Sequence, residues 1–124
     1  MLLILTSIMP ARAQEPVPVF DLHSDILLRI IDYGIDLGDP PRWPQVTIPT
    51  MREGHVQDQV FAIWVNSNTH QGPAATKRAL KMIDLFHQQA GRHPEHLALA
   101  RTVAEAQKIK DSGRIACWLW IEGG

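Results

Sequence analysis

Three short apolar segments, separated by stretches with helical periodicity, constrain the fold of this chain more than any other feature. They lie within residues 18–23, 56–65 and 114–121, the second of which is apolar mainly in its second half, and turn-forming or polar residues bound each of them. Nearly continuous apolar runs of this length are typical of strands that are buried on both faces of a parallel sheet. We therefore predict three buried strands in an α/β fold whose helices cover the sheet.

Helical patterns lie between these strands. In the longest one, apolar residues recur at three- and four-residue steps, which places them on one helical face. Another opens with Thr102 and Glu105 in the pattern of a capping box. A proline-rich stretch at 38–49 is expected to be an irregular loop. The predicted helical segments are 26–33, 50–54 (a short turn or helix), 74–89 and 102–111.

The first thirteen residues differ in character from the rest of the chain. An apolar run from Met1 to Met9 is followed by Ala11 and Ala13, small residues at the spacing that signal peptidase accepts. We predict a signal peptide at 1–13, incomplete because the usual charged region is missing, and export to the periplasm or the cell exterior, with membrane association left open. The run is far shorter than the roughly 20 residues of a transmembrane helix. A buried first strand is the alternative.

Charge and cysteine content exclude several classes of protein. The formal net charge is -1, so no basic field favours nucleic-acid binding. The single cysteine, Cys117, lies inside the third apolar segment and can form neither an internal disulfide nor a thiolate zinc site. We expect it to be a small buried hydrophobic residue.

Polar groups stand at the ends of two of the predicted strands. His23 and Asp25 follow the first and Glu122 follows the third. In parallel α/β folds such strand ends are where functional sites are built. One imidazole and two carboxylates suit zinc, and manganese or cobalt would accept the same donors. Asp21, deeper on the same face, is a candidate for orienting one of these ligands.

Each of these groups also has an ordinary explanation. A His-x-Asp triplet occurs by chance, and Glu122 before two glycines fits a cap or turn residue. His55, which follows Gly54, is predicted to be an exposed loop residue. The remaining histidines fit no metal-binding spacing.

Several ordered segments resemble the membrane dipeptidase family (renal dipeptidase, peptidase family M19). The Asp-x-His-x-Asp of residues 21–25 is similar to the motif that opens the family's barrel, and Glu122-Gly123-Gly124 resembles the Glu-Gly-Gly that ends its third strand. The chain departs from the family at His55, where a second glycine is usual. The other similar segments are Ile48–Gly54 with Val60–Trp64, Met82–His87 and Ala104–Ala116.

This resemblance implies a (β/α)8 TIM-like barrel of the metal-dependent hydrolase type, with two zinc ions. His23 and Asp25 would bind the first ion, Glu122 would bridge both, and a metal-activated water would hydrolyse a dipeptide. Such a barrel needs roughly 250 residues. We therefore expect residues 14–124 to be the N-terminal part of a barrel cut after about three strands, inactive by itself and without an identifiable catalytic residue beyond the metal ligands. A homodimer of the full-length protein is compatible with the resemblance.

Two other functions stay open at this point. A different barrel amidohydrolase, acting on cyclic amides or N-acyl amino acids, more often opens with His-x-His, and Asp25 stands against it. A non-catalytic exported binding domain would use His23, Asp25 and Glu122 only structurally. Zinc content distinguishes the binding domain from either enzyme.

Overall fold

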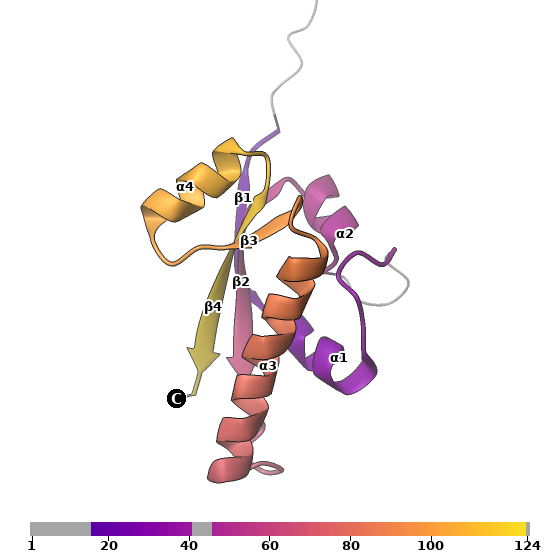
Figure 1. Cartoon of the computed structure of the whole chain (residues 1–124), viewed down its shortest axis with the longest axis vertical. Coiled ribbons are helices and arrows are strands. Elements are labelled where there is room, and N and C mark those ends of the chain that lie inside the picture. Colours follow the sequence, from indigo (N-terminus) through magenta and orange to yellow (C-terminus); the bar gives the residue numbers. More distant parts are fainter. Residues whose placement is uncertain (1–15, 41–45, 124) are drawn as a thin grey trace, which may run out of the picture.

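A parallel sheet forms the centre of the structure (Figure 1). The computed structural model describes residues 16–40 and 46–123, so the predicted signal peptide at 1–13 lies outside the described residues. Within these ranges the sheet has four strands in the order β1-β2-β4-β3. The strands are β1 (Val19–Ser24), β2 (Val56–Trp64), β3 (Leu97–Leu99) and β4 (Ile115–Glu122).

The three predicted strands correspond to β1, β2 and β4, and the number of strands was wrong by one. The additional strand, β3, pairs with the beginning of β4, with Leu97 opposite Ile115 and Leu99 opposite Cys117. Three residues are too few to show a period of two. This strand is therefore created by its tertiary partner and has no signal of its own.

The predicted helices are confirmed, with small shifts at their ends. Gly34, in the left-handed conformation at φ 67°, ends the first helix and donates its N–H to Ile30 O. The Thr102 side chain caps the fourth helix by accepting from the Glu105 N–H. The second helix starts two residues earlier than predicted because Thr47 caps it. The helices are α1 (Ile26–Tyr33), α2 (Ile48–Glu53), α3 (Pro73–Arg92) and α4 (Val103–Asp111).

Helices α1, α2 and α3 pack on one face of the sheet and enclose the main core. Phe61 of β2 and Phe86 of α3 are both fully buried, with ring centroids 5.3 Å apart. Ile115 and Cys117 are two residues apart on β4, so both point to this same face. The apolar stripe predicted for α3 therefore faces the sheet, through Met82 and Phe86.

Helix α4 lies on the opposite side of the sheet from α1 and α2 (Figure 1). Its residues Ala106 and Ile109 pack against Ala116, near the start of β4. Towards the carboxyl end of β4 the same face carries Trp120, which is 61% exposed. Helix α4 thus covers the first half of this face and leaves the second half open among the described residues.

The prediction that the first strand is buried was wrong. Most residues of β1 are exposed, with Phe20 at 51% and Leu22 at 63%. In the described part of the chain β1 is an edge strand that pairs with β2 alone. The composition of a strand reports what it can bury, and only its neighbours decide what it does bury.

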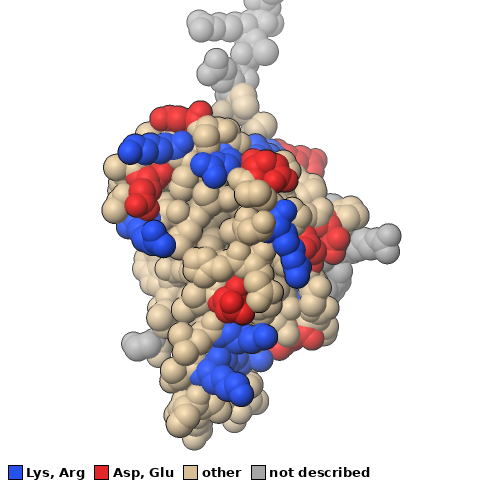
Figure 2. Space-filling view, in the orientation of Figure 1, with Lys and Arg blue, Asp and Glu red and all other residues tan. Residues whose placement is uncertain are grey.

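Charges of both signs are interspersed on the face of the molecule that Figure 2 shows. Two ion pairs fasten α3 to the segment that contains and follows α1. Arg78 lies 2.7 Å from Asp32, and Arg92 lies 3.1 Å from Asp36. No helix among the described residues has both the length and the apolarity needed to cross a membrane.

Candidate metal centre

The structure brings together the three side chains that the sequence singled out as metal ligands. Asp25 and Glu122 both approach the His23 ring, with Nε2 of His23 lying 3.5 Å from Oδ1 of Asp25 and 3.6 Å from Oε2 of Glu122. One ligand atom from each residue lies within 4.8 Å of the others. In the described part of the chain this is the one group of histidine, cysteine or acidic residues with such a geometry.

Sheet topology explains how residues a hundred positions apart meet. His23 lies near the end of β1 and Glu122 ends β4, and both strands pair in parallel with β2. Parallel strands bring their carboxyl ends to one edge of the sheet, which is the lower edge in Figure 1. Glu122 pairs in register with Trp64, the last residue of β2.

Asp25 occupies a helix cap without capping it. It is the N-cap residue of α1, yet its side chain accepts no hydrogen bond from the helix. Aspartate at this position usually binds a free N–H of the first turn. Here the carboxylate instead faces His23, and its backbone carbonyl accepts the N–H of Leu28 at 2.9 Å. The Asp25 carboxylate thus lacks the usual capping hydrogen bond and lies in the cluster instead.

All three side chains are about half exposed, between 50% and 55%. Water and ions therefore have direct access to the donor atoms. A cavity of about 370 Å³ adjoins the cluster, with His23 and Glu122 in its wall. Its other lining residues are mostly apolar: Leu22, Ala62, Trp120, Ile121 and Gly123.

The Asp21 carboxylate contacts the cluster through the backbone N–H of His23. Its Oδ1 accepts the N–H of His23 at 3.1 Å, and its Oδ2 accepts from Nε2 of Gln59 at 2.9 Å. The sequence had indicated Asp21 as a group that orients a ligand. Gln59 was missed, because a glutamine in the polar beginning of β2 gives no signal of what it contacts.

The other histidines lie away from the cluster. His55 is exposed, as predicted, and has a positive φ of 55°, a conformation in which glycine is more usual. His93 is bound to Asp36 at 2.5 Å. His96 contacts the Arg52 guanidinium.

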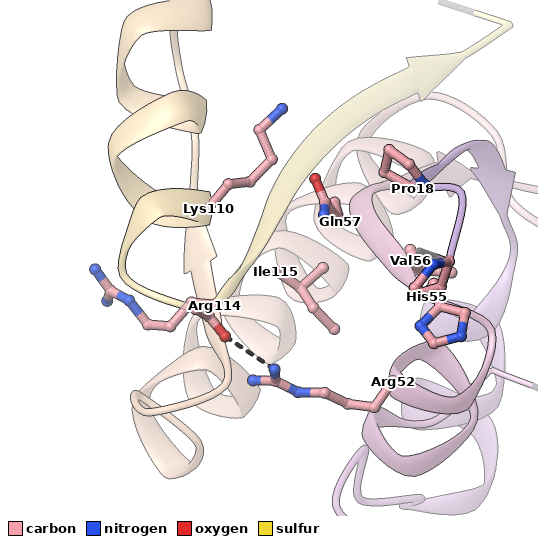
Figure 3. A pocket seen from close by; sticks show the side chains of 10 residues that line it. Pro18, Arg52, His55, Val56, Gln57, Lys110, Arg114 and Ile115 are labelled. Atoms are coloured by element: carbon pink, nitrogen blue, oxygen red, sulfur yellow. Dashed lines mark hydrogen bonds between the residues drawn. The ribbon is translucent and has the colours of Figure 1, made fainter. Parts of the chain in front are cut away.

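A second cavity, of about 240 Å³, lies at the other end of the strands (Figure 3). Arg52 stands on one side of it and Lys110 and Arg114 on the other, and none of its described lining residues is acidic. These cations already have partners: Arg52 donates to Gly113 O at 2.9 Å, and Lys110 lies 2.8 Å from Asp58. The residues around this cavity therefore serve to hold α2 against the turn that precedes β4.

Cys117 belongs neither to the metal cluster nor to the lining of either cavity described above. It is fully buried, and desolvation raises the pKa of its thiol to about 12. A thiol in this state is neither a nucleophile nor a metal ligand at neutral pH. The prediction of a small buried hydrophobic residue is confirmed.

The parallel sheet and the cluster at the carboxyl ends of its strands define an α/β protein with the donor set of a metal centre. The chain belongs to the membrane dipeptidase family, peptidase family M19, whose sequence model matches residues 10–124. It is similar to the dipeptidase ataJ of Aspergillus terreus, with 30% identity over 128 residues. That match covers 90% of this chain and 31% of the fungal protein.

Two solved structures share the fold. One is dipeptidase AC, a metallopeptidase of family M19, with a TM-score of 0.72 and 26% identity over 88% of this chain and 36% of that one. The other is a metallopeptidase from Rhodobacter sphaeroides, liganded with a phosphinate mimic of the dipeptide L-Ala-D-Ala, with a TM-score of 0.69 and 23% identity over 88% of this chain and 39% of that one. The chain thus spans about a third of the length of these relatives.

Proposed function

We propose that the protein to which this chain belongs is a zinc-dependent dipeptidase whose first metal ligands are His23, Asp25 and Glu122. The observation that carries the proposal is the convergence of these three side chains at the carboxyl ends of β1 and β4. Membership of a dipeptidase family supports the reaction class. It also favours a dipeptidase over the amidohydrolase and the non-catalytic binding domain.

The spacing of the donor atoms fits a zinc ion. Zinc binds imidazole nitrogen and carboxylate oxygen at about 2.0–2.2 Å, so two ligands at a tetrahedral angle lie about 3.4 Å apart. The distances from His23 Nε2 to Asp25 and Glu122 are 3.5 Å and 3.6 Å. Both distances from His23 to a carboxylate therefore already match the separation of two ligands of one ion.

The ligands and the adjoining cavity have separate roles in this proposal. When bound, zinc supplies a Lewis acid and lowers the pKa of a coordinated water. His23, Asp25 and Glu122 would hold the ion. The cavity beside them, lined by Leu22 and Trp120 among others, has room for an apolar side chain of a dipeptide.

Further parts of the proposal concern the whole protein. The similar proteins are more than twice as long, and their remaining length has room for more metal ligands. We propose that two zinc ions bind in a closed (β/α)8 barrel, and that residues 14–124 form its N-terminal part. Residues 1–13 are proposed to direct export. The 124-residue chain alone is proposed to be inactive.

Metal titration of the 124-residue chain tests the ligand set. We expect zinc or cobalt to bind one-to-one in isothermal titration calorimetry and His23→Ala to abolish this binding. His87→Ala is the matched control, because His87 is an exposed histidine of α3 outside the cluster. Equal binding by His23→Ala would overturn the proposed ligand set.

Activity tests the rest of the proposal. A form of the protein as long as its relatives should hydrolyse L-Ala-D-Ala, lose this activity on chelation and recover it with zinc. The 124-residue chain should release no amino acid under the same conditions. Turnover by the short chain, or chelator-resistant turnover by the long form, would contradict the proposal.

A further inference from the structure

The strand that carries His23 is irregular at that residue. Asp21 pairs with Gln59 and Ser24 pairs with Phe61, so β1 advances three residues while β2 advances two. This is the residue count of a β-bulge, which redirects a side chain and removes backbone groups from the regular ladder. The direction of the His23 side chain therefore depends on whatever holds the bulge.

Asp21 holds the bulge from within β1. Its Oδ1 accepts the His23 N–H, at 3.1 Å. An aspartate that binds a backbone N–H two residues ahead stabilises a local turn in place of extended strand. The His23 backbone is thus fixed by the orientation of the Asp21 carboxylate.

Gln59 in turn holds Asp21. It is fully buried, and its Nε2 donates to Asp21 Oδ2 at 2.9 Å and to Val60 O at 3.0 Å. Its Oε1 is buried and has no hydrogen-bond partner among the residues that the structure describes. Turning the amide over would place this oxygen against the Asp21 carboxylate, so the observed orientation is the one that keeps the contact with Asp21.

An unpartnered oxygen in the core is a cost that an apolar side chain would avoid. Such local costs are kept where the surrounding structure uses them, most often beside functional sites. We infer that Gln59 and Asp21 are positioning residues, which hold the bulge of β1 so that the His23 imidazole faces Asp25 and Glu122. This inference rests on the proposed metal site.

Cobalt binding by the 124-residue chain tests the inference without relying on activity. Gln59→Leu removes the donor and keeps a similar size. We expect it to weaken cobalt binding by about 10–100-fold, the usual effect of losing a group behind a ligand. We also expect the visible absorption of the bound cobalt to change, because this spectrum reports ligand geometry.

Gln89→Leu is the matched control. Gln89 is also a buried glutamine, but it bonds the Leu37 N–H and Ile35 O, away from the cluster. Its loss should lower the stability of the fold and leave the cobalt spectrum and the affinity of the folded protein unchanged.

Asp21 supplies a second route if Gln59→Leu does not fold, because Asp21 is only partly buried. Asp21→Ala removes the acceptor for the His23 N–H and should weaken cobalt binding and change the spectrum as Gln59→Leu does. Asp21→Asn keeps this acceptor and can donate to the free Gln59 Oε1 after the amide turns, so it should retain most of the affinity.

Two results would overturn the inference in different ways. Unchanged affinity and spectrum in Gln59→Leu, or in Asp21→Ala where Gln59→Leu does not fold, would refute the positioning role and leave the metal site standing. Failure of the unaltered chain to bind cobalt would refute the proposed metal site and the positioning role with it.

Discussion

Lys110→Met should destabilise the fold more than Asp58→Asn, although both break the same ion pair. Lys110 of α4 lies 2.8 Å from Asp58 of β2, whose other oxygen accepts the Trp118 Nε1–H at 3.1 Å. The side chain of Asp58 is 7% exposed and that of Lys110 is 24% exposed. The ion pair therefore joins α4 to the sheet, and its carboxylate is more completely shielded from water than its ammonium group.

The size of the effect follows from what each substitution leaves behind. Lys110→Met leaves a buried carboxylate with one hydrogen bond, and a buried charge without its partner costs about 3–5 kcal/mol. Asp58→Asn keeps an acceptor for Trp118, and the ammonium group of Lys110 can turn toward water. We expect its cost to be about 1–2 kcal/mol, that of one charged hydrogen bond.

Urea denaturation of the 124-residue chain, followed by tryptophan fluorescence, measures both values. The double variant should be more stable than Lys110→Met alone, because it no longer buries an unpaired charge. Gln107→Met on the exposed face of α4 controls for the change in helix composition. Equal costs for the two single variants, or a double variant less stable than Lys110→Met, would refute this account of the pair.

Three further predictions concern the backbone, pH and the buried thiol. Gly34→Ala should cost about 1 kcal/mol, because Gly34 is left-handed with open space around it, whereas Gly91→Ala inside α3 should stabilise by about 0.5–1 kcal/mol; denaturation midpoints of opposite sign test this pair. Partial burial raises the pKa of Asp36, but hydrogen bonds from Gly38 N–H, His93 and Arg92 lower it by more, to below its ordinary value of 3.8. The ionised Asp36 carboxylate contributes its full stabilisation above pH 3.8, and this contribution is lost as the pH falls through the lowered pKa. Asp36→Asn should therefore be less stable than the unaltered chain at pH 7. In thermal melts at falling pH, the variant should lack this part of the acid-induced loss of stability. Cys117 should react with a disulfide reagent at pH 8 only as fast as the chain unfolds, and rapid labelling of the folded chain would contradict its burial.

The sequence predicted the local structure because local structure depends on near neighbours. The Thr102 cap and the apolar stripe of α3 act within one or two helical turns, and both are confirmed. The convergence of His23, Asp25 and Glu122 was also predictable. It follows from the rule that parallel strands end at one edge, once three strands are assigned.

Tertiary structure alone decided the other contacts between distant segments. Strand β3 exists through its pairing with β4, and the exposure of β1 follows from its place at the edge of the sheet among the described residues. The same holds for the hydrogen bond from Gln59 to Asp21, which joins residues 38 positions apart in the chain. Such pairings depend on sheet order and register, and a one-residue change of register would reverse which face every side chain occupies.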